Sequence, residues 1–101
     1  MTDSPLISVI TPTYNRAHVL GRAIRSLRGQ TLGRYEHIIV DDGSSDDTRD
    51  IVAAFRDDRI RYLAFPERRG ANTARNAGLD MARAPLVTFL DSDDEYRPHR
   101  L

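Results

Sequence analysis

The stretch that decides the fold is LISVITPTYNR, residues 6–16. Its first part, Leu6–Ile10, is a short apolar run rich in β-branched residues, which predicts a buried strand that Pro12 stops. Apolar residues then recur at helical spacing between Val19 and Leu27, with arginines on the opposite face, and Gly29 follows as a helix stop. The chain therefore opens with a strand, a polar loop and a helix.

The same alternation continues along the chain. Further strands are predicted at His37–Val40, Ile60–Phe65 and Leu86–Leu90, and further helices around Ile51–Phe55 and at Asn72–Arg83. Strands that are apolar throughout and alternate with helices indicate a parallel sheet covered by helices. We therefore predict an α/β fold, a Rossmann-like parallel sheet with flanking helices and the strand order 3-2-1-4 of a mononucleotide-binding half.

Composition limits the possible functions. A chain of 101 residues allows one small domain. Its 15 acidic and 15 basic residues give no net charge, so nucleic acid is not an expected partner. The chain has no cysteine, the spacing of His18, His37 and His99 does not suit zinc, and no apolar run is long enough for a membrane span. We expect a cytoplasmic location, with the inner face of the membrane as the alternative for a longer protein.

Polar residues gather after three of the predicted strands, at Thr13–Arg16, Asp41–Asp47 and Asp91–Glu95. Ligands of open α/β sheets bind beyond the carboxyl ends of the strands. The three clusters are therefore expected to converge on one site.

The last cluster, Asp91-Ser92-Asp93-Asp94, places several carboxylates together directly after a strand. Such carboxylates repel one another unless a cation or protons neutralise them, and Mg²⁺ and Mn²⁺ prefer oxygen ligands. A metal site is one interpretation. An acidic cap on a following helix, stabilised by the helix dipole, is the other.

Three further residues suit a nucleotide. The Asp42 carboxylate could accept a hydrogen bond from a base, Tyr14 could stack on one, and Arg75 could pair with phosphate near a helix N-terminus. Ordinary turn chemistry, side-chain packing and an exposed helical arginine explain the same residues without a ligand.

Four motifs, taken together, resemble the family 2 glycosyltransferases. They are SVITPTYNR at 8–16, IVDDGSSD at 39–46, ARNAG at 74–78 and FLDSDD at 89–94, and they occur in the order and rough spacing of that family. The resemblance implies a GT-A fold, a nucleotide-diphosphate-sugar donor, with a UDP-sugar expected, and inversion at the anomeric carbon.

The resemblance also implies roles for individual residues. Pro12 and Tyr14 would line the base pocket, and Asp42 would hydrogen-bond the base. Arg75 would lie near the ribose or the diphosphate.

Asp91 and Asp93 form the D-x-D element of the family. Asp93 is the expected direct ligand of Mn²⁺ or Mg²⁺, and Asp91 would face the ribose or the water shell of the metal.

The catalytic general base of such enzymes is an acidic residue well downstream of the D-x-D element, and we expect it beyond Leu101. We therefore expect residues 1–101 to form one truncated GT-A nucleotide-diphospho-sugar-binding domain. A truncated sheet leaves an edge and apolar surface uncovered, which favours a homo-oligomer. The acceptor, whether a glycan, a lipid or a protein, stays open.

Three other interpretations of the sequence compete with a glycosyltransferase. A receiver-like phosphoacceptor domain normally needs a lysine, which this chain lacks. A dinucleotide-binding domain or a P-loop protein would carry glycine motifs that are absent from the sequence. A non-catalytic domain that binds nucleotide stays open for this chain on its own.

Overall fold

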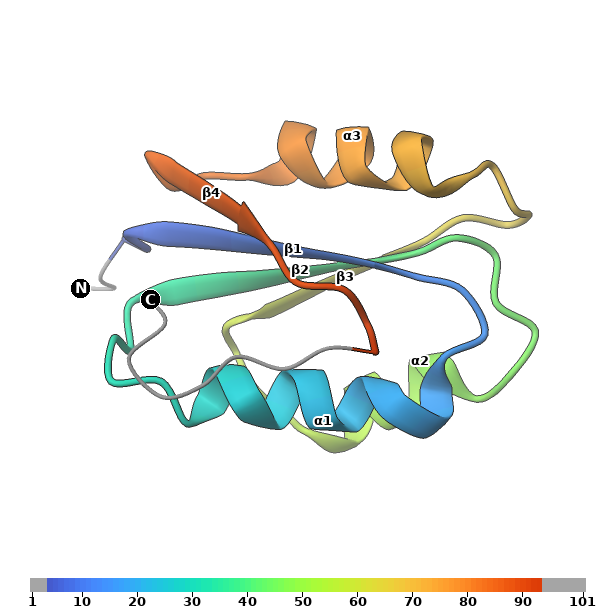
Figure 1. Ribbon diagram of the computed structural model, residues 1–101, viewed down its shortest axis with the longest axis horizontal. Coiled ribbons are helices and arrows are strands. Elements are labelled where there is room, and N and C mark those ends of the chain that lie inside the picture. Colours follow the sequence, from blue (N-terminus) through green and yellow to red (C-terminus); the bar gives the residue numbers. More distant parts are fainter. Residues whose placement is uncertain (1–3, 94–101) are drawn as a thin grey trace.

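The computed structural model describes residues 4–93 and contains four strands and three helices (Figure 1). In chain order they are β1 (Ile7–Thr13), α1 (Ala17–Arg28), β2 (Tyr35–Asp41), α2 (Thr48–Ala54), β3 (Ile60–Ala64), α3 (Ala71–Met81) and β4 (Leu86–Phe89). Every predicted element is present. The boundaries differ by up to three residues: β1 continues to Thr13 instead of ending at Ile10, and α3 ends at Met81 instead of Arg83.

The four strands form one parallel sheet in the order β3-β2-β1-β4, as predicted. Helices α1 and α2 cover one face of the sheet and α3 covers the other (Figure 1). The parallel strands direct all their carboxyl ends to the same edge, which is where the loops that carry the polar clusters begin.

Pro12 does not stop β1, contrary to the prediction, because the strand continues to Thr13. Strand β4 pairs only with Ile7–Ile10, whereas β2 pairs with the whole of β1. Successive residues of a strand direct their backbone groups to opposite neighbours: the carbonyl of Ile10 accepts from Leu90, and that of Thr13 accepts from Asp42. Pro12 therefore faces the side where β4 has already ended, and no ladder bond is lost there.

The core lies on both faces of the sheet. On the α3 face, Ile10, Ile38 and Val40 pack against Ala74. A Cβ atom at Gly78 would lie 2.5 Å from the Ile10 side chain, so only glycine lets α3 approach the sheet this closely.

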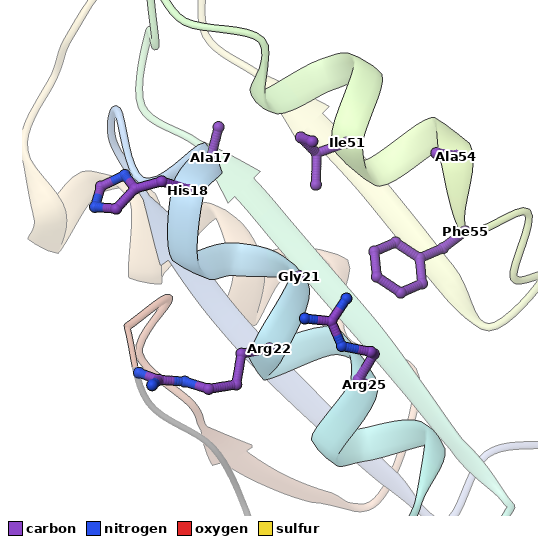
Figure 2. Close-up of a pocket in the computed structure, with 8 residues that line it drawn as sticks. All are labelled: Ala17, His18, Gly21, Arg22, Arg25, Ile51, Ala54 and Phe55. Atoms are coloured by element: carbon purple, nitrogen blue, oxygen red, sulfur yellow. The ribbon is translucent and has the colours of Figure 1, made fainter.

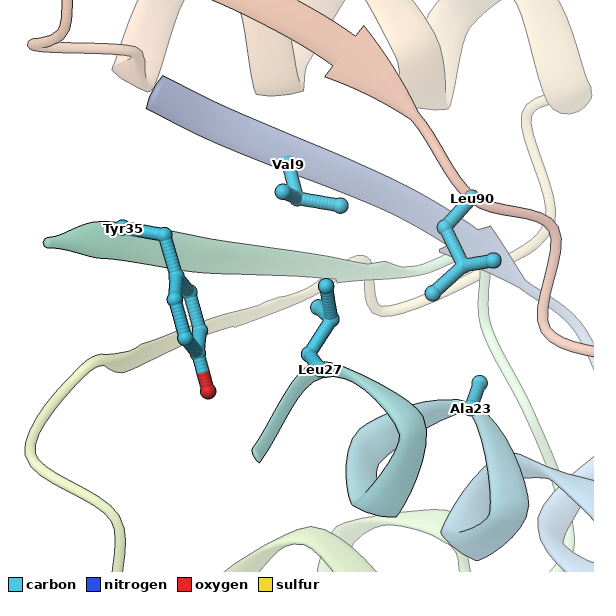
Figure 3. Close-up of a cluster of buried hydrophobic side chains, with 5 residues drawn as sticks. All are labelled: Val9, Ala23, Leu27, Tyr35 and Leu90. Atoms are coloured by element: carbon cyan, nitrogen blue, oxygen red, sulfur yellow. The ribbon is translucent and has the colours of Figure 1, made fainter. Parts of the chain in front are cut away.

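On the other face, helix α1 supplies most of the apolar contacts. One cluster joins strands β1 and β2 to this helix and to the residue after β4 (Figure 3); its members are Val9, Ala23, Leu27, Tyr35 and Leu90. A second cluster joins α1, β2 and α2 through Leu20, Ile24, Ile39 and Val52. Together the two clusters fix α1 against the sheet beneath the loops of the polar edge.

Two buried polar groups on β2 have partners within the fold. The Glu36 carboxylate accepts from the Ser8 hydroxyl at 2.6 Å and from the backbone N–H of Arg83 at 2.7 Å. Burial alone would raise the pKa of Glu36, but these bonds and that from Arg61 hold it below its usual value. His37 shares a 2.7 Å hydrogen bond with Thr11, and burial lowers the pKa of its imidazole to about 3. His37 is therefore a buried, hydrogen-bonded part of the fold.

Strand β4 is largely exposed, although its sequence is apolar. Leu86 is 61% exposed, Val87 40% and Phe89 42%. Its sheet neighbour is β1, and within residues 4–93 no element pairs with its other edge. The apolar side chains of β4 therefore form an exposed apolar surface on residues 4–93.

Candidate functional site

The three polar clusters meet in one pocket of about 240 Å³ at the carboxyl edge of the sheet. All of the site residues predicted from the sequence line this strand-end pocket: Pro12, Tyr14, Asp42, Arg75, Asp91 and Asp93. Thr13, Arg16, Arg68, Ala71 and Ser92 complete its wall. The predicted convergence is confirmed, and β1, β2, β4 and α3 all contribute to it.

The loop after β1 is held by the loop after β2. The backbone N–H of Asn15 donates to the Ser44 hydroxyl, and the Asn15 side-chain oxygen accepts from the Ser45 N–H, each at 2.8 Å. Asn15 itself has φ of 50°, a left-handed conformation that asparagine tolerates better than most residues. This pair of bonds fixes the backbone next to Tyr14 at the pocket.

Helix α1 begins at the same junction. The Asp46 carboxylate accepts from the backbone N–H of Ala17 at 3.1 Å and from that of Thr48 at 3.2 Å. One side chain therefore accepts from the first backbone N–H of both α1 and α2. The residue in the capping position of α2 is Asp47, whose side chain makes no capping bond.

Asp41 and Asp42 face opposite sides of the sheet. Asp41 accepts from the Tyr62 hydroxyl and from the Ser44 backbone, on the face that α1 and α2 cover. Asp42 is only 3% exposed and lines the strand-end pocket. The alternation of side chains along an extended backbone thus leaves one aspartate of the pair for the site.

The Asp42 carboxylate also organises the loop between β3 and α3. It accepts from the backbone N–H of Arg69 at 2.7 Å and from that of Gly70 at 3.0 Å. Gly43 makes this approach feasible, because it has φ of 79° and a Cβ atom there would lie 2.5 Å from the Glu67 carbonyl carbon. Asp42 therefore positions a loop in addition to lining the pocket.

Arg68, on that loop, is a pocket residue that the sequence analysis missed. Its guanidinium lies 4.2 Å from the centre of the Tyr14 ring and its Nε lies 3.9 Å from an Asp42 oxygen. The only local signal was the Arg68-Arg69-Gly70 sequence before α3. Its contact with Tyr14 arises from the fold, since the two residues are far apart in the chain.

Positive charge collects on one side of the pocket. Arg16, Arg68 and Arg75 line it together with Ala71, the first residue of α3. Arg75 donates one bond to the Asn72 side chain at 3.3 Å, which engages one of the five N–H groups of a guanidinium. Arginine side chains and the N-terminus of a helix are the groups that bind phosphate oxygens.

Negative charge collects on the loop after β4. Asp91 and Asp93 are exposed at the pocket, and Ser92 between them is buried. The loop is fixed at its start, where the Leu90 N–H donates to the Ile10 carbonyl at 3.0 Å. Asp94 and Glu95, the rest of the predicted acidic cluster, lie outside the described residues.

Two carboxylates suit a metal that is shared with a substrate. No group of three histidine, cysteine or acidic side chains that could hold a metal occurs in residues 4–93. Mg²⁺ often binds through one or two carboxylates and completes its coordination with substrate phosphates and water. The donor set of Asp91 and Asp93 opposite three arginines fits that kind of site.

A second hollow, larger than the first, lies between α1 and α2 (Figure 2). This helix groove has a volume of about 470 Å³ and contains none of the predicted site residues. Its lining is Ala17, His18, Gly21, Arg22, Arg25, Ile51, Ala54 and Phe55, without an acidic side chain.

The comparison with protein families decides between the interpretations that the sequence left open. The family described as glycosyl transferase family 2 matches residues 8–101, which is nearly the whole chain. The chain belongs to this family. The receiver-like and dinucleotide-binding alternatives are thereby excluded.

Curated relatives carry the same assignment. The GalNAc(5)-diNAcBac-PP-undecaprenol β-1,3-glucosyltransferase of Campylobacter jejuni is 46% identical over 90% of this chain and 30% of its own length. WfgD of Escherichia coli, a UDP-Glc:α-D-GlcNAc-diphosphoundecaprenol β-1,3-glucosyltransferase, is 40% identical over 98% of this chain and 39% of its own length. The chain thus spans well under half of the length of these relatives.

Solved structures share the fold. TarS of Staphylococcus aureus (residues 1–349), in complex with UDP-GlcNAc, superposes with a TM-score of 0.86 at 33% identity, over 90% of this chain and 27% of that one. The mannosyltransferase PcManGT of Pyrobaculum calidifontis, in complex with GDP-Man and Mn²⁺, gives 0.83 at 29% identity, over 94% and 29%. These neighbours are GT-A glycosyltransferases, so the predicted fold class is confirmed. Among the described residues, no helix is long and apolar enough to cross a membrane.

Proposed function

We propose that this chain forms the donor- and metal-binding half of an inverting glycosyltransferase that moves a sugar from a UDP-sugar to an acceptor hydroxyl. The observation that carries the proposal is the convergence of the six predicted residues in the strand-end pocket. Membership of family 2 and neighbours solved with UDP-GlcNAc and with GDP-Man support the donor class.

The base would bind at the side of the pocket formed by Pro12, Tyr14 and Asp42. An aromatic ring provides a stacking surface for a nucleobase, and a carboxylate accepts hydrogen bonds from base N–H groups. Each Asp42 oxygen already accepts from the loop at Arg69 and Gly70, but a carboxylate has about four acceptor sites. The Asp42 carboxylate can therefore hold the loop and a base at once.

The diphosphate would bind between the arginines and the loop after β4. Arg75, Arg68 and the start of α3 are placed to neutralise phosphate oxygens on one side. Asp93, with Asp91, would hold Mn²⁺ or Mg²⁺ on the other side. The bound cation supplies Lewis-acid stabilisation of the charge that develops as the nucleoside diphosphate leaves.

Inversion requires one displacement at the anomeric carbon. The acceptor oxygen forms its bond to that carbon while the bond to the diphosphate oxygen breaks, and a general base takes the hydroxyl proton. We propose that the base is an acidic residue beyond Leu101. The acceptor pocket is proposed to lie in the same part of the longer protein. A non-catalytic nucleotide-binding role for residues 1–101 on their own is the second candidate, and it predicts the same donor binding without transfer.

Calorimetric titration with UDP, in Mn²⁺ and in EDTA, tests the proposal. We expect UDP to bind more tightly in Mn²⁺, and Asp93→Ala to remove that difference while leaving binding in EDTA intact. Asp80→Ala is the matched control, since Asp80 is an exposed aspartate on α3 that does not line the pocket. A metal dependence that survives in Asp93→Ala would refute the metal assignment, and failure to bind any nucleoside diphosphate would refute the donor site.

A further inference from the structure

Arg22 of helix α1 contacts the acidic loop after β4. The Arg22 guanidinium donates from Nη2 to the backbone carbonyl of Asp93 at 2.8 Å, across 71 residues of sequence. In Figure 2 the Arg22 side chain extends towards the loop after β4, whereas Arg25, three residues further along the same helix, is directed to the side of α2. Two arginines of one helix therefore have different surroundings.

The hydrogen bond from Arg22 is made to the backbone of Asp93, which is the proposed metal ligand. The loop is anchored at its start by the bond between Leu90 and Ile10, and its exposed end is where Asp93 must present a carboxylate. A hydrogen bond from a charged donor is stronger than a neutral one, and it restrains the peptide group it contacts. Restraining the Asp93 carbonyl limits the positions that its carboxylate can adopt.

The contact that the structure shows is to the main-chain carbonyl of Asp93, so Arg22 acts through the position of the backbone. The charge of a guanidinium close to the site would by itself oppose a divalent cation. The effect of Arg22 on cation binding therefore depends on geometry and not on charge.

We propose that Arg22 is a positioning residue for the metal site: it holds the Asp93 backbone so that the Asp93 carboxylate is preorganised for a divalent cation. The inference rests on the proposed function, because it takes Asp93 as a metal ligand. It adds a residue of α1 that lies outside the four motifs of the family resemblance and outside the strand-end pocket.

The alternative is a surface contact without functional effect. Arg22 is exposed, and exposed polar contacts commonly contribute little to stability. The two possibilities differ in what they predict for metal binding, because a preorganising contact affects cation affinity even where it leaves stability unchanged.

The test is a Mn²⁺ titration in the presence of UDP, followed by electron paramagnetic resonance of free Mn²⁺. We expect Arg22→Ala to weaken Mn²⁺ affinity about tenfold, since losing a residue that orients a metal ligand typically costs that much or more. Arg22→Lys, which keeps the charge and a donor, should recover part of the loss. Arg25→Ala, the matched control on the same helix, should bind Mn²⁺ as the unchanged protein does.

UDP titration in EDTA separates a metal-specific role from a general one. Arg22→Ala should bind UDP in EDTA with unchanged affinity and melt at an unchanged temperature. Equal weakening of UDP in EDTA and in Mn²⁺ would overturn the inference, as would unchanged Mn²⁺ affinity in Arg22→Ala while Asp93→Ala loses it. Unchanged Mn²⁺ affinity in Asp93→Ala would instead refute the metal site itself.

Discussion

The strand-end pocket and the helix groove lie on different parts of the molecule, and the groove is the bigger by volume, about 470 Å³ against about 240 Å³. Their linings differ in kind. The groove combines apolar side chains with basic ones and has no carboxylate. The pocket brings together three arginines, three aspartates and a tyrosine from loops that are distant in the sequence.

The difference shows why position in the fold indicates function better than volume. The carboxyl ends of parallel strands all open on one edge, so residues after different strands meet there with their polar groups directed at the same space. The groove is the space left where two helices pack side by side on the outer face. Nothing in that geometry gathers groups of both charges.

The largest effect on the pocket is expected from Asp42→Ala. It would leave the partly buried N–H groups of Arg69 and Gly70 without their charged acceptor, at a cost of about 2 kcal/mol in the free energy of unfolding. UDP binding should weaken in Mn²⁺ and in EDTA alike, with looser selectivity among nucleoside diphosphates. Urea denaturation and calorimetry measure the two effects, and unchanged stability would show that the loop does not depend on Asp42.

The pH dependence of the free energy of unfolding tests the buried His37 on β2, away from the strand-end pocket. Burial depresses the pKa of His37 to about 3 in the folded protein, and the unfolded value is near 6.5. Below pH 6.5 the unfolded chain binds a proton that the folded chain does not, so stability falls as pH falls.

For this one group the loss approaches about 1.4 kcal/mol per pH unit below the unfolded pKa. Urea denaturation between pH 7 and pH 5 should show it, and His37→Gln should flatten the slope. His18→Gln, an exposed histidine of α1, serves as the control. An identical slope in His37→Gln would contradict the assignment of the effect to His37.

A smaller effect is expected from Arg68→Ala. The substitution removes the guanidinium that lies over the Tyr14 ring. The same guanidinium is one of the three cations on the proposed phosphate-binding side of the strand-end pocket. A cation–π contact at a partly exposed site contributes about 0.5–1 kcal/mol, so we expect UDP affinity to fall a few-fold. Arg69→Ala is the matched control, because Arg69 lies over Phe65 instead. Equal losses in both variants would mean that general charge, and not the position of Arg68, supports binding.

The smallest effect is expected when the helix groove is filled. Ala54→Leu adds an apolar side chain at an exposed position of the groove. UDP affinity with Mn²⁺ should stay within about twofold of the unchanged protein, because Ala54 does not line the strand-end pocket. A clear loss of UDP affinity would show that the groove takes part in donor binding.

The sheet order and the residues that line the strand-end pocket could be predicted from local patterns together with the four motifs of the family resemblance. Apolar runs mark the strands, and polar residues directly after them must meet at one edge. What the sequence could not show depends on the lengths and contacts of distant segments. Pro12 stays in β1 because β4 is short, and Arg68 reaches Tyr14 only through the loop that Asp42 holds.

Other predictions stay predictions. These are the extent of the domain, the homo-oligomer and the cytoplasmic location. The exposed Leu86, Val87 and Phe89 of β4 are the surface on which an oligomer contact would be expected. Light scattering of the protein and of Phe89→Ser would show whether this strand mediates association.

A crystal structure with UDP and Mn²⁺ tests the central claim most directly. We predict an anomalous manganese peak beside the Asp93 carboxylate, at the distance of about 2.2 Å typical of a metal–oxygen bond. The uracil should lie beside Tyr14 and the diphosphate between Arg75 and the metal. Nucleotide bound in the helix groove, or manganese bound away from Asp93, would contradict it.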